Sequence, residues 1–155
     1  MKSRALASAT VAAIVGVGLI AALPAQGRAR CTLKGTSGAN LALLGTNSRD
    51  VICAKAGDDN VVARDGRDVV RAGRGSDTVE GNEGADVIKG NRGADSLEGN
   101  LGKDRVKGGP GNDKIVTADA VRGNDKALGG KGKDDICVID KRDRTRGCET
   151  VRVRV

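Results

Sequence analysis

The chain has 155 residues, a formal net charge of +7, 24 glycines and no Phe, Tyr, Trp or His. A conventional core of this size uses several aromatic side chains, so the composition argues against an ordinary globular fold. It also argues against histidine-based catalysis and against nucleic-acid binding by base stacking. Low hydrophobicity with many glycines is typical of disordered chains, unless the glycines are regularly spaced.

The first 27 residues have the three parts of a secretory signal peptide. Lys2 and Arg4 form a basic start, residues 9–23 form an apolar run, and residues 24–27 form a small-residue end. The apolar run is about fifteen residues long, which is short for a bilayer span. We therefore expect residues 1–27 to be removed, the mature chain to be secreted, and no membrane span to remain in it.

Aspartates recur every nine residues through most of the remaining sequence. Eight follow in strict steps: Asp50, Asp59, Asp68, Asp77, Asp86, Asp95, Asp104 and Asp113. After a three-residue insertion around 117–120, the step resumes with Asp125 and Asp134. A glycine precedes most of these aspartates by two residues, and an aliphatic residue follows by two: Ile52, Val61, Val70, Val79, Ile88, Leu97, Val106, Ile115 and Ile136. A fixed period of this kind indicates a repeat architecture and argues against disorder.

Four consecutive repeats show the full pattern: GNEGADVIK at 81–89, GNRGADSLE at 90–98, GNLGKDRVK at 99–107 and GGPGNDKIV at 108–116. This pattern resembles the G-G-x-G-x-D-x-U-x nonapeptide of RTX (repeats-in-toxin) calcium-binding proteins, here as a small secreted bacterial member. The resemblance covers roughly residues 35–137. It implies an all-β fold, a right-handed parallel β-roll (β-solenoid) of nine-residue repeats with 18 residues per coil.

The residue types agree with that fold. The aliphatic residue and its two neighbours suit a three-residue strand with the aliphatic side chain inward, because side chains alternate along a strand. The second repeat position holds mostly Gly or Asn, which tolerate a positive φ in a tight turn. Two repeats then complete one coil, and the coils stack into two parallel sheets around a thin aliphatic core.

Aspartates 18 residues apart should lie one above the other, about 4.8 Å apart. Stacked carboxylates repel, and burial makes their charged form less favourable still. A divalent cation between successive turns would relieve this repulsion. Calcium accepts six to eight oxygen ligands at about 2.3–2.6 Å, so several Ca²⁺ ions are expected. With no histidine, zinc is not expected.

In the RTX family the sixth-position aspartate binds calcium together with turn carbonyls. The resemblance makes the aspartates of the most regular turns the best candidates, Asp77, Asp86, Asp95, Asp104 and Asp113, followed by Asp59, Asp68 and Asp134. Asp50, Asp59, Asp68 and Asp125 are weaker candidates because Lys55, Arg64, Ser48 and Ala127 depart from the pattern. Alternatively, each aspartate serves only as a turn residue in a degenerate, metal-free roll. Nearby Lys and Arg predict weak dissociation constants of about 10⁻⁴–10⁻³ M.

The four cysteines allow three disulfide pairings. The pairing of Cys31 with Cys53 and of Cys137 with Cys148 is favoured, because the roll would separate the other combinations. These bridges would staple the two open ends of the solenoid. The expected organisation is therefore a signal peptide (1–27), an N-terminal cap with degenerate repeats (28–49), a calcium-binding roll (50–137), and a C-terminal disulfide cap with a basic tail (138–155).

The outward position after each aliphatic residue separates charge between the two sheets. One sheet presents Arg71, Lys89 and Lys107, and the other presents Glu80 and Glu98. The basic face and the basic tail are candidates for binding an anionic cell-envelope polymer. No Ser or Cys lies beside a plausible base, and Gly132-Lys133 is followed by Asp134, unlike a P-loop. We expect a non-catalytic calcium-binding module or, alternatively, an adhesion protein that uses a metal-free roll as scaffold.

Overall fold

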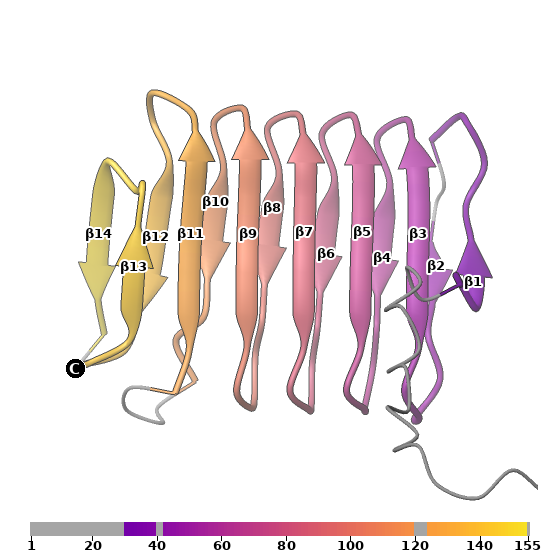
Figure 1. Cartoon of the computed structure of the whole chain (residues 1–155), viewed down its shortest axis with the longest axis horizontal. Helices are drawn as coiled ribbons and strands as arrows, with labels where there is room; N and C mark the ends of the chain where they lie inside the picture. The colour runs from indigo at the N-terminus through magenta and orange to yellow at the C-terminus, as the bar shows by residue number, and fades with distance from the viewer. Residues whose placement is uncertain (1–29, 40–41, 120–123, 155) are drawn as a thin grey trace, which may run out of the picture.

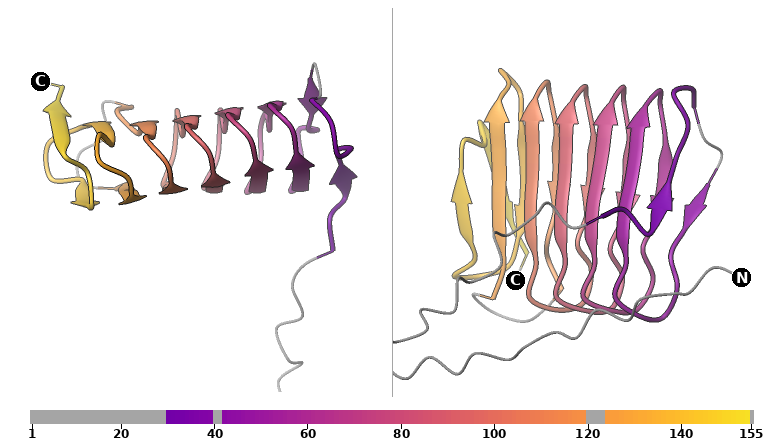
Figure 2. Two further views of the ribbon diagram at one scale, coloured as in Figure 1. Left: turned by 90° about the horizontal axis from the view of Figure 1, so that it is seen from above. Right: turned by 45° about the vertical axis from the view of Figure 1, so that its right-hand side comes forward.

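The computed structural model describes residues 30–39, 42–119 and 124–154, so the expected signal peptide (1–27) lies outside the described residues. The described residues form strands and turns with no helix, and therefore no helix that could span a membrane. The strands form two parallel seven-stranded sheets, and the chain alternates between them at every step. Figure 1 looks onto one sheet with the other behind it, and Figure 2 shows the two layers from above.

The sheet in front in Figure 1, called sheet A, contains the odd-numbered strands. They are β1 (Leu33–Lys34), β3 (Val51–Ala56), β5 (Val69–Arg74), β7 (Val87–Arg92), β9 (Arg105–Pro110), β11 (Lys126–Lys131) and β13 (Arg144–Arg146). Sheet B contains β2 (Leu43–Leu44), β4 (Asn60–Val62), β6 (Thr78–Glu80), β8 (Ser96–Glu98), β10 (Lys114–Val116), β12 (Ile136–Ile139) and β14 (Thr150–Val153). The predicted three-residue strands occur in the middle of sheet B, whereas β3, β5, β7, β9 and β11 of sheet A continue for six residues.

The register confirms the 18-residue coil. Val70 pairs with Ile88 on sheet A, and Val79 pairs with Leu97 on sheet B. The predicted insertion is also confirmed, because the next coil pairs Val106 with Ala127, three residues beyond the regular step.

The prediction that Ile136 faces the core is wrong. Ile115 pairs with Cys137, so Cys137 is fully buried and Ile136 is only half-buried. The chain places one further residue in the turn before β12. Because strand side chains alternate, this one-residue shift exchanges the inward and outward positions.

The core is a single row of aliphatic side chains from each sheet. The predicted inward residues from Ile52 to Ile115 are at most 1% exposed. Each such side chain stabilises the fold by about 1.5–3 kcal/mol on burial. Alanines at the first repeat position (Ala54, Ala63, Ala72) complete the core near the turns.

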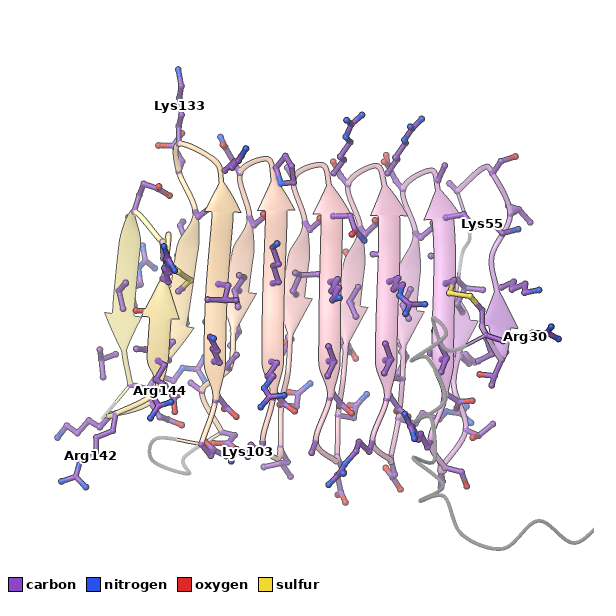
Figure 3. The ribbon with its side chains drawn as sticks, viewed as in Figure 1. Arg30, Lys55, Lys103, Lys133, Arg142 and Arg144 are labelled. Carbon is purple, nitrogen blue, oxygen red and sulfur yellow. A yellow bond between two sulfur atoms is a disulfide. The ribbon has the colours of Figure 1, made fainter. Side chains whose placement is uncertain are left out.

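Two disulfides tie the ends of the solenoid with the predicted pairing. Cys31 is bonded to Cys53 of β3, and Cys137 of β12 is bonded to Cys148. Figure 3 shows the two bridges at opposite ends of the roll. Each bridge closes a short loop. It lowers the entropy of the unfolded chain and so stabilises the fold by about 3 kcal/mol. The roll between them carries the repeated aspartates.

Candidate metal centre

The sixth-position aspartates form two columns, one along each turn edge of the roll. The edge at the top of Figure 1 holds Asp59, Asp77, Asp95, Asp113 and Asp135, and the edge at the bottom holds Asp50, Asp68, Asp86, Asp104 and Asp125. All ten side chains are buried. The predicted stacking of aspartates 18 residues apart is therefore confirmed.

Each column is joined by hydrogen bonds from backbone to side chain. The backbone N–H of Asp77 donates to Oδ1 of Asp95 at 2.9 Å, and that of Asp86 donates to Oδ1 of Asp104 at 2.9 Å. The same bond recurs from Asp50 to Asp68 and from Asp95 to Asp113. One oxygen of each carboxylate is thereby fixed by the neighbouring coil.

The second carboxylate oxygen is different. Oδ2 is buried and accepts no hydrogen bond in eight of these residues: Asp68, Asp77, Asp86, Asp95, Asp104, Asp113, Asp125 and Asp135. A buried acceptor without a donor costs about 1–3 kcal/mol, and more when it is charged. Each of these oxygens needs a proton or a cation.

The electrostatics of the columns lead to the same requirement. Burial, with repulsion from the neighbouring aspartates, raises the pKa of Asp77, Asp86 and Asp95 to about 6. The same causes raise the pKa of Asp104 and Asp125 to about 7. The charged columns are thus unfavourable near neutral pH unless positive charge lies beside them.

Glycines make room for this arrangement of oxygens. A Cβ added at Gly90 or Gly108 would overlap Oδ2 of the aspartate in the same turn, Asp95 or Asp113. A Cβ added at the fourth-position Gly102 would overlap a backbone carbonyl oxygen of the preceding coil. Carboxylate and carbonyl oxygens therefore line turns that only glycine leaves open.

This donor set suits calcium. Within residues 30–39, 42–119 and 124–154, no three acidic, His or Cys side chains gather around one point. An ion at a column would therefore take one or two carboxylates and complete its shell with carbonyls and water. Calcium accepts such a shell in flexible geometry, whereas structural zinc needs nitrogen or sulfur ligands.

Two adjoining segments, residues 44–79 and 80–115, match the family model described as RTX calcium-binding nonapeptide repeat (4 copies). Residues 44–115 belong to the RTX nonapeptide repeat family. These RTX repeats contain the eight sixth-position aspartates from Asp50 to Asp113. Neither the curated proteins nor the solved structures provided a match to the chain.

Asp134, a predicted site residue, does not lie in a column. It is exposed, and its neighbour Asp135 takes the buried position, with Oδ1 accepting from the backbone N–H of Asp113 at 2.8 Å. The cause is again the extra residue before β12, which shifts the repeat by one. The other predicted residues (Asp59, Asp68, Asp77, Asp86, Asp95, Asp104 and Asp113) all lie in the columns.

Sequence reasoning missed the residues that continue the columns beyond the RTX repeats. The backbone N–H of Asp125 donates to Oδ1 of Asp143 at 3.3 Å, and that of Asp135 donates to Oε2 of Glu149 at 2.8 Å. Asp143 lies 18 residues after Asp125, so the nine-residue step could have identified it. Asp135 and Glu149 were hidden by the extra residue.

Asp50 is satisfied by the protein itself. Its Oδ2 accepts from the backbone N–H of Thr46 at 2.7 Å and from the Thr46 hydroxyl at 2.9 Å, and its Oδ1 accepts from the Thr32 hydroxyl at 3.1 Å. These hydrogen bonds, that from the Thr46 backbone first, lower the pKa of Asp50 despite its burial. This carboxylate has no unmet need for a cation.

The two edges also differ in charge at the fifth repeat position, directly before each aspartate. On the lower edge of Figure 1 this position holds Arg49, Arg67 and Lys103, and Figure 3 shows Lys103 there. On the upper edge the corresponding residues include Asp58 and Asn112. The upper edge carries basic residues at another position, since Arg74 and Arg92 end β5 and β7 directly before its turns, so both columns have positive charge beside them.

Proposed function

We propose that the RTX repeats bind several Ca²⁺ ions along the two aspartate columns and that these ions stabilise, or drive the folding of, a secreted non-catalytic module. The observation that carries this proposal is the row of buried Oδ2 atoms that accept no hydrogen bond. An ion at each turn would neutralise two stacked carboxylates and complete their coordination with carbonyl oxygens. The first candidates are Asp77, Asp86, Asp95, Asp104 and Asp113, with Asp59 and Asp68 after them.

Secretion would link the folding of the roll to the calcium concentration outside the cell. RTX repeat proteins are typically extracellular, and two disulfides fit an oxidising compartment. Calcium-free carboxylate columns disfavour the folded roll near neutral pH, so folding would follow arrival in a calcium-rich medium. At ten times its dissociation constant each ion adds about 1.4 kcal/mol, and four such ions would decide whether so thin a core folds.

Far-ultraviolet circular dichroism of the protein, titrated from chelator to about 10 mM calcium, tests the proposal, with magnesium as the control. We expect a cooperative gain of strand signal with calcium and a much smaller gain with magnesium. The chain has no aromatic residue, so near-ultraviolet circular dichroism would report only the two disulfides at the ends of the roll. A complete strand spectrum in chelator, unchanged by calcium, would contradict the proposal and favour the metal-free scaffold.

We further propose that the partner of the exported roll is an anionic cell-envelope polymer. The supporting observation is the basic row of Arg71, Lys89 and Lys107 on the outward face of sheet A, together with the basic C-terminal tail. This binding would be compatible with the calcium module, because it uses a different surface. It would also serve the alternative function, adhesion by a metal-free roll.

A further inference from the structure

The two sheets differ strongly in charge. Sheet B carries Lys114 and Arg152 beside Glu80 and Glu98. Sheet A, all of whose strands lie in the described part of the chain, contains no Asp or Glu and twelve basic residues: Lys34, Lys55, Arg71, Arg74, Lys89, Arg92, Arg105, Lys107, Lys126, Lys131, Arg144 and Arg146. This face is uniformly positive over its seven strands.

The register stacks these charges in rows along the solenoid axis. Arg71 pairs with Lys89, and Lys89 pairs with Lys107. Arg74 pairs with Arg92 in a parallel row nearer the turns. Like charges on neighbouring strands lie about 4.8 Å apart and destabilise a sheet. The rows are therefore unfavourable for the isolated fold, and bound negative charge would relieve them.

A hollow of about 570 Å³ runs between the two rows across β3, β5, β7 and β9. Lys89 and Lys107 line one wall, and Arg74 and Arg92 line the other. The floor is formed by the second repeat position, which holds Gly73, Asn91 and Gly109 and, at the β3 end, Lys55. At Gly73 and Gly109, φ is 139° and an added Cβ would overlap the carbonyl oxygen of the neighbouring strand, so the floor cannot be filled there. We call this hollow the axial trough.

We infer that the axial trough binds a single extended polyanion chain, a linear acidic polysaccharide, along the solenoid axis. The inference rests on the proposed polymer partner and assigns it to one site. Charges recur once per strand at about 4.8 Å, close to the length of one sugar unit in an extended polysaccharide. Basic side chains from both walls can then reach anionic groups on alternate sides of the bound polysaccharide. A flat anionic bilayer would touch the walls without reaching the recessed floor.

The test compares two double charge reversals with the same change in net charge. Lys89→Glu/Arg92→Glu alters the two walls of the trough, and Lys114→Glu/Arg152→Glu alters exposed residues of sheet B. Binding of fluorescent dextran sulfate is measured by anisotropy in 5 mM calcium at low and high salt. We expect the trough variant to bind at least about ten-fold more weakly and the sheet B variant to change less than about two-fold. Binding should weaken steeply with salt, since it releases counterions.

Folding is checked by the melting temperature of each variant without the polymer. The trough variant should melt no lower than the parent protein, because Glu at 89 would lie between Arg71 and Lys107. Equal losses of binding in both variants would overturn the trough, because net charge alone would explain them. Undiminished binding by the trough variant would also overturn it and would place the polymer on the basic tail.

Two further results would separate this inference from the proposed function. Absence of dextran sulfate binding to the parent protein would overturn both the trough and the polymer partner, while the calcium titration would stand. Tighter binding to phosphatidylglycerol vesicles than to dextran sulfate would overturn the linear chain in favour of a membrane surface.

Discussion

Asp50 and Asp95 hold the same place in the repeat, yet their carboxylates have different partners. In the first turn, Oδ2 of Asp50 accepts two hydrogen bonds from Thr46, and the pKa is lowered. In the central turn, Oδ2 of Asp95 is buried without a hydrogen bond, and burial raises the pKa to about 6. One turn satisfies its aspartate with protein donors, and the other leaves it to a proton or a metal.

The second repeat position explains the difference. Asn91 adopts a positive φ of 82°, which Asn tolerates and β-branched residues avoid. Thr46 is not among the described residues with a positive φ, and its backbone N–H and hydroxyl both turn toward Asp50. Thr46 thus closes this turn on its own aspartate. This teaches that the presence of a sixth-position Asp does not by itself define a calcium site.

The largest expected effect comes from filling a central turn. Gly84 has a φ of 145°, and the Cβ of Gly84→Ala would overlap the carbonyl oxygen of Gly66 in the preceding coil. The two coils must therefore separate. We expect a loss of about 3 kcal/mol or more and no cooperative strand signal at 10 mM calcium. Gly38→Ala, between β1 and β2, is the control, because a Cβ there meets open space. Equal melting of the two variants would contradict the close stacking of the central turns.

Neutralising the two aspartates separates their roles. Asp95→Asn keeps an oxygen for the N–H of Asp77 and removes a buried charge, so the calcium-free protein should become no less stable. It should lose the calcium gain of about two ions, roughly 3 kcal/mol at ten times the dissociation constant. Asp50→Asn instead faces the Thr46 donors with an NH₂ group and should lose stability equally with and without calcium.

Urea unfolding followed by circular dichroism, in chelator and in 5 mM calcium, measures both quantities for each variant. A calcium gain that survives in Asp95→Asn but disappears in Asp50→Asn would reverse the comparison.

The pH dependence of the calcium-free protein follows from the raised pKa values. Asp77, Asp86 and Asp95 titrate at about 6 in the folded protein, and Asp104 and Asp125 at about 7, against 3.8 ordinarily. Their protonated forms favour folding, so this stability is present below pH 4 and is lost as the pH rises to about 7. The contribution of Asp50 to stability has the opposite pH dependence. Because its pKa is lowered in the folded protein, this contribution is present near neutral pH and is lost only in acid.

Melting temperatures in chelator from pH 4 to 8 should therefore fall as the pH rises, and calcium should restore them at pH 7.5 more than at pH 5. A calcium-free protein that is most stable at pH 8 would show that the columns are not strained by charge.

The nine-residue period predicted the inward residues from Ile52 to Ile115, because spacing is displayed directly by a sequence. The 18-residue coil, and with it the two columns, came from the resemblance to RTX repeats, and the disulfide pairing came from the position of the cysteines at the two ends of the roll. Asp134 and Ile136 were placed wrongly because one extra residue before β12 is invisible when both Asp134 and Asp135 can fit the pattern.

The hydrogen bonds to the Asp50 carboxylate and the axial trough of sheet A depend on backbone conformation. The nine-residue repeat pattern carries no information about that conformation. Sequence reasoning treated every strand as three residues long, whereas those in the middle of sheet A run six residues, through the second repeat position. That continuation brings Arg74 and Arg92 into register with each other, three residues beyond Arg71 and Lys89, and so creates the second wall. The single row of Arg71, Lys89 and Lys107 was the part that alternation could predict.

The smallest expected effect comes from removing one donor to Asp50. Thr46→Val preserves shape and the backbone N–H but deletes the hydroxyl that donates at 2.9 Å. We expect a loss of about 1 kcal/mol that is the same in chelator and in calcium. The acid limb of the stability curve should also move to higher pH, because the pKa of Asp50 would rise.

Thr78→Val, at an exposed position of β6, is the control and should change stability by less than about 0.5 kcal/mol. A calcium gain larger than that of the parent protein would mean that Asp50 also accepts an ion once Thr46 holds it less firmly, and the first turn would then differ from the central ones in degree only.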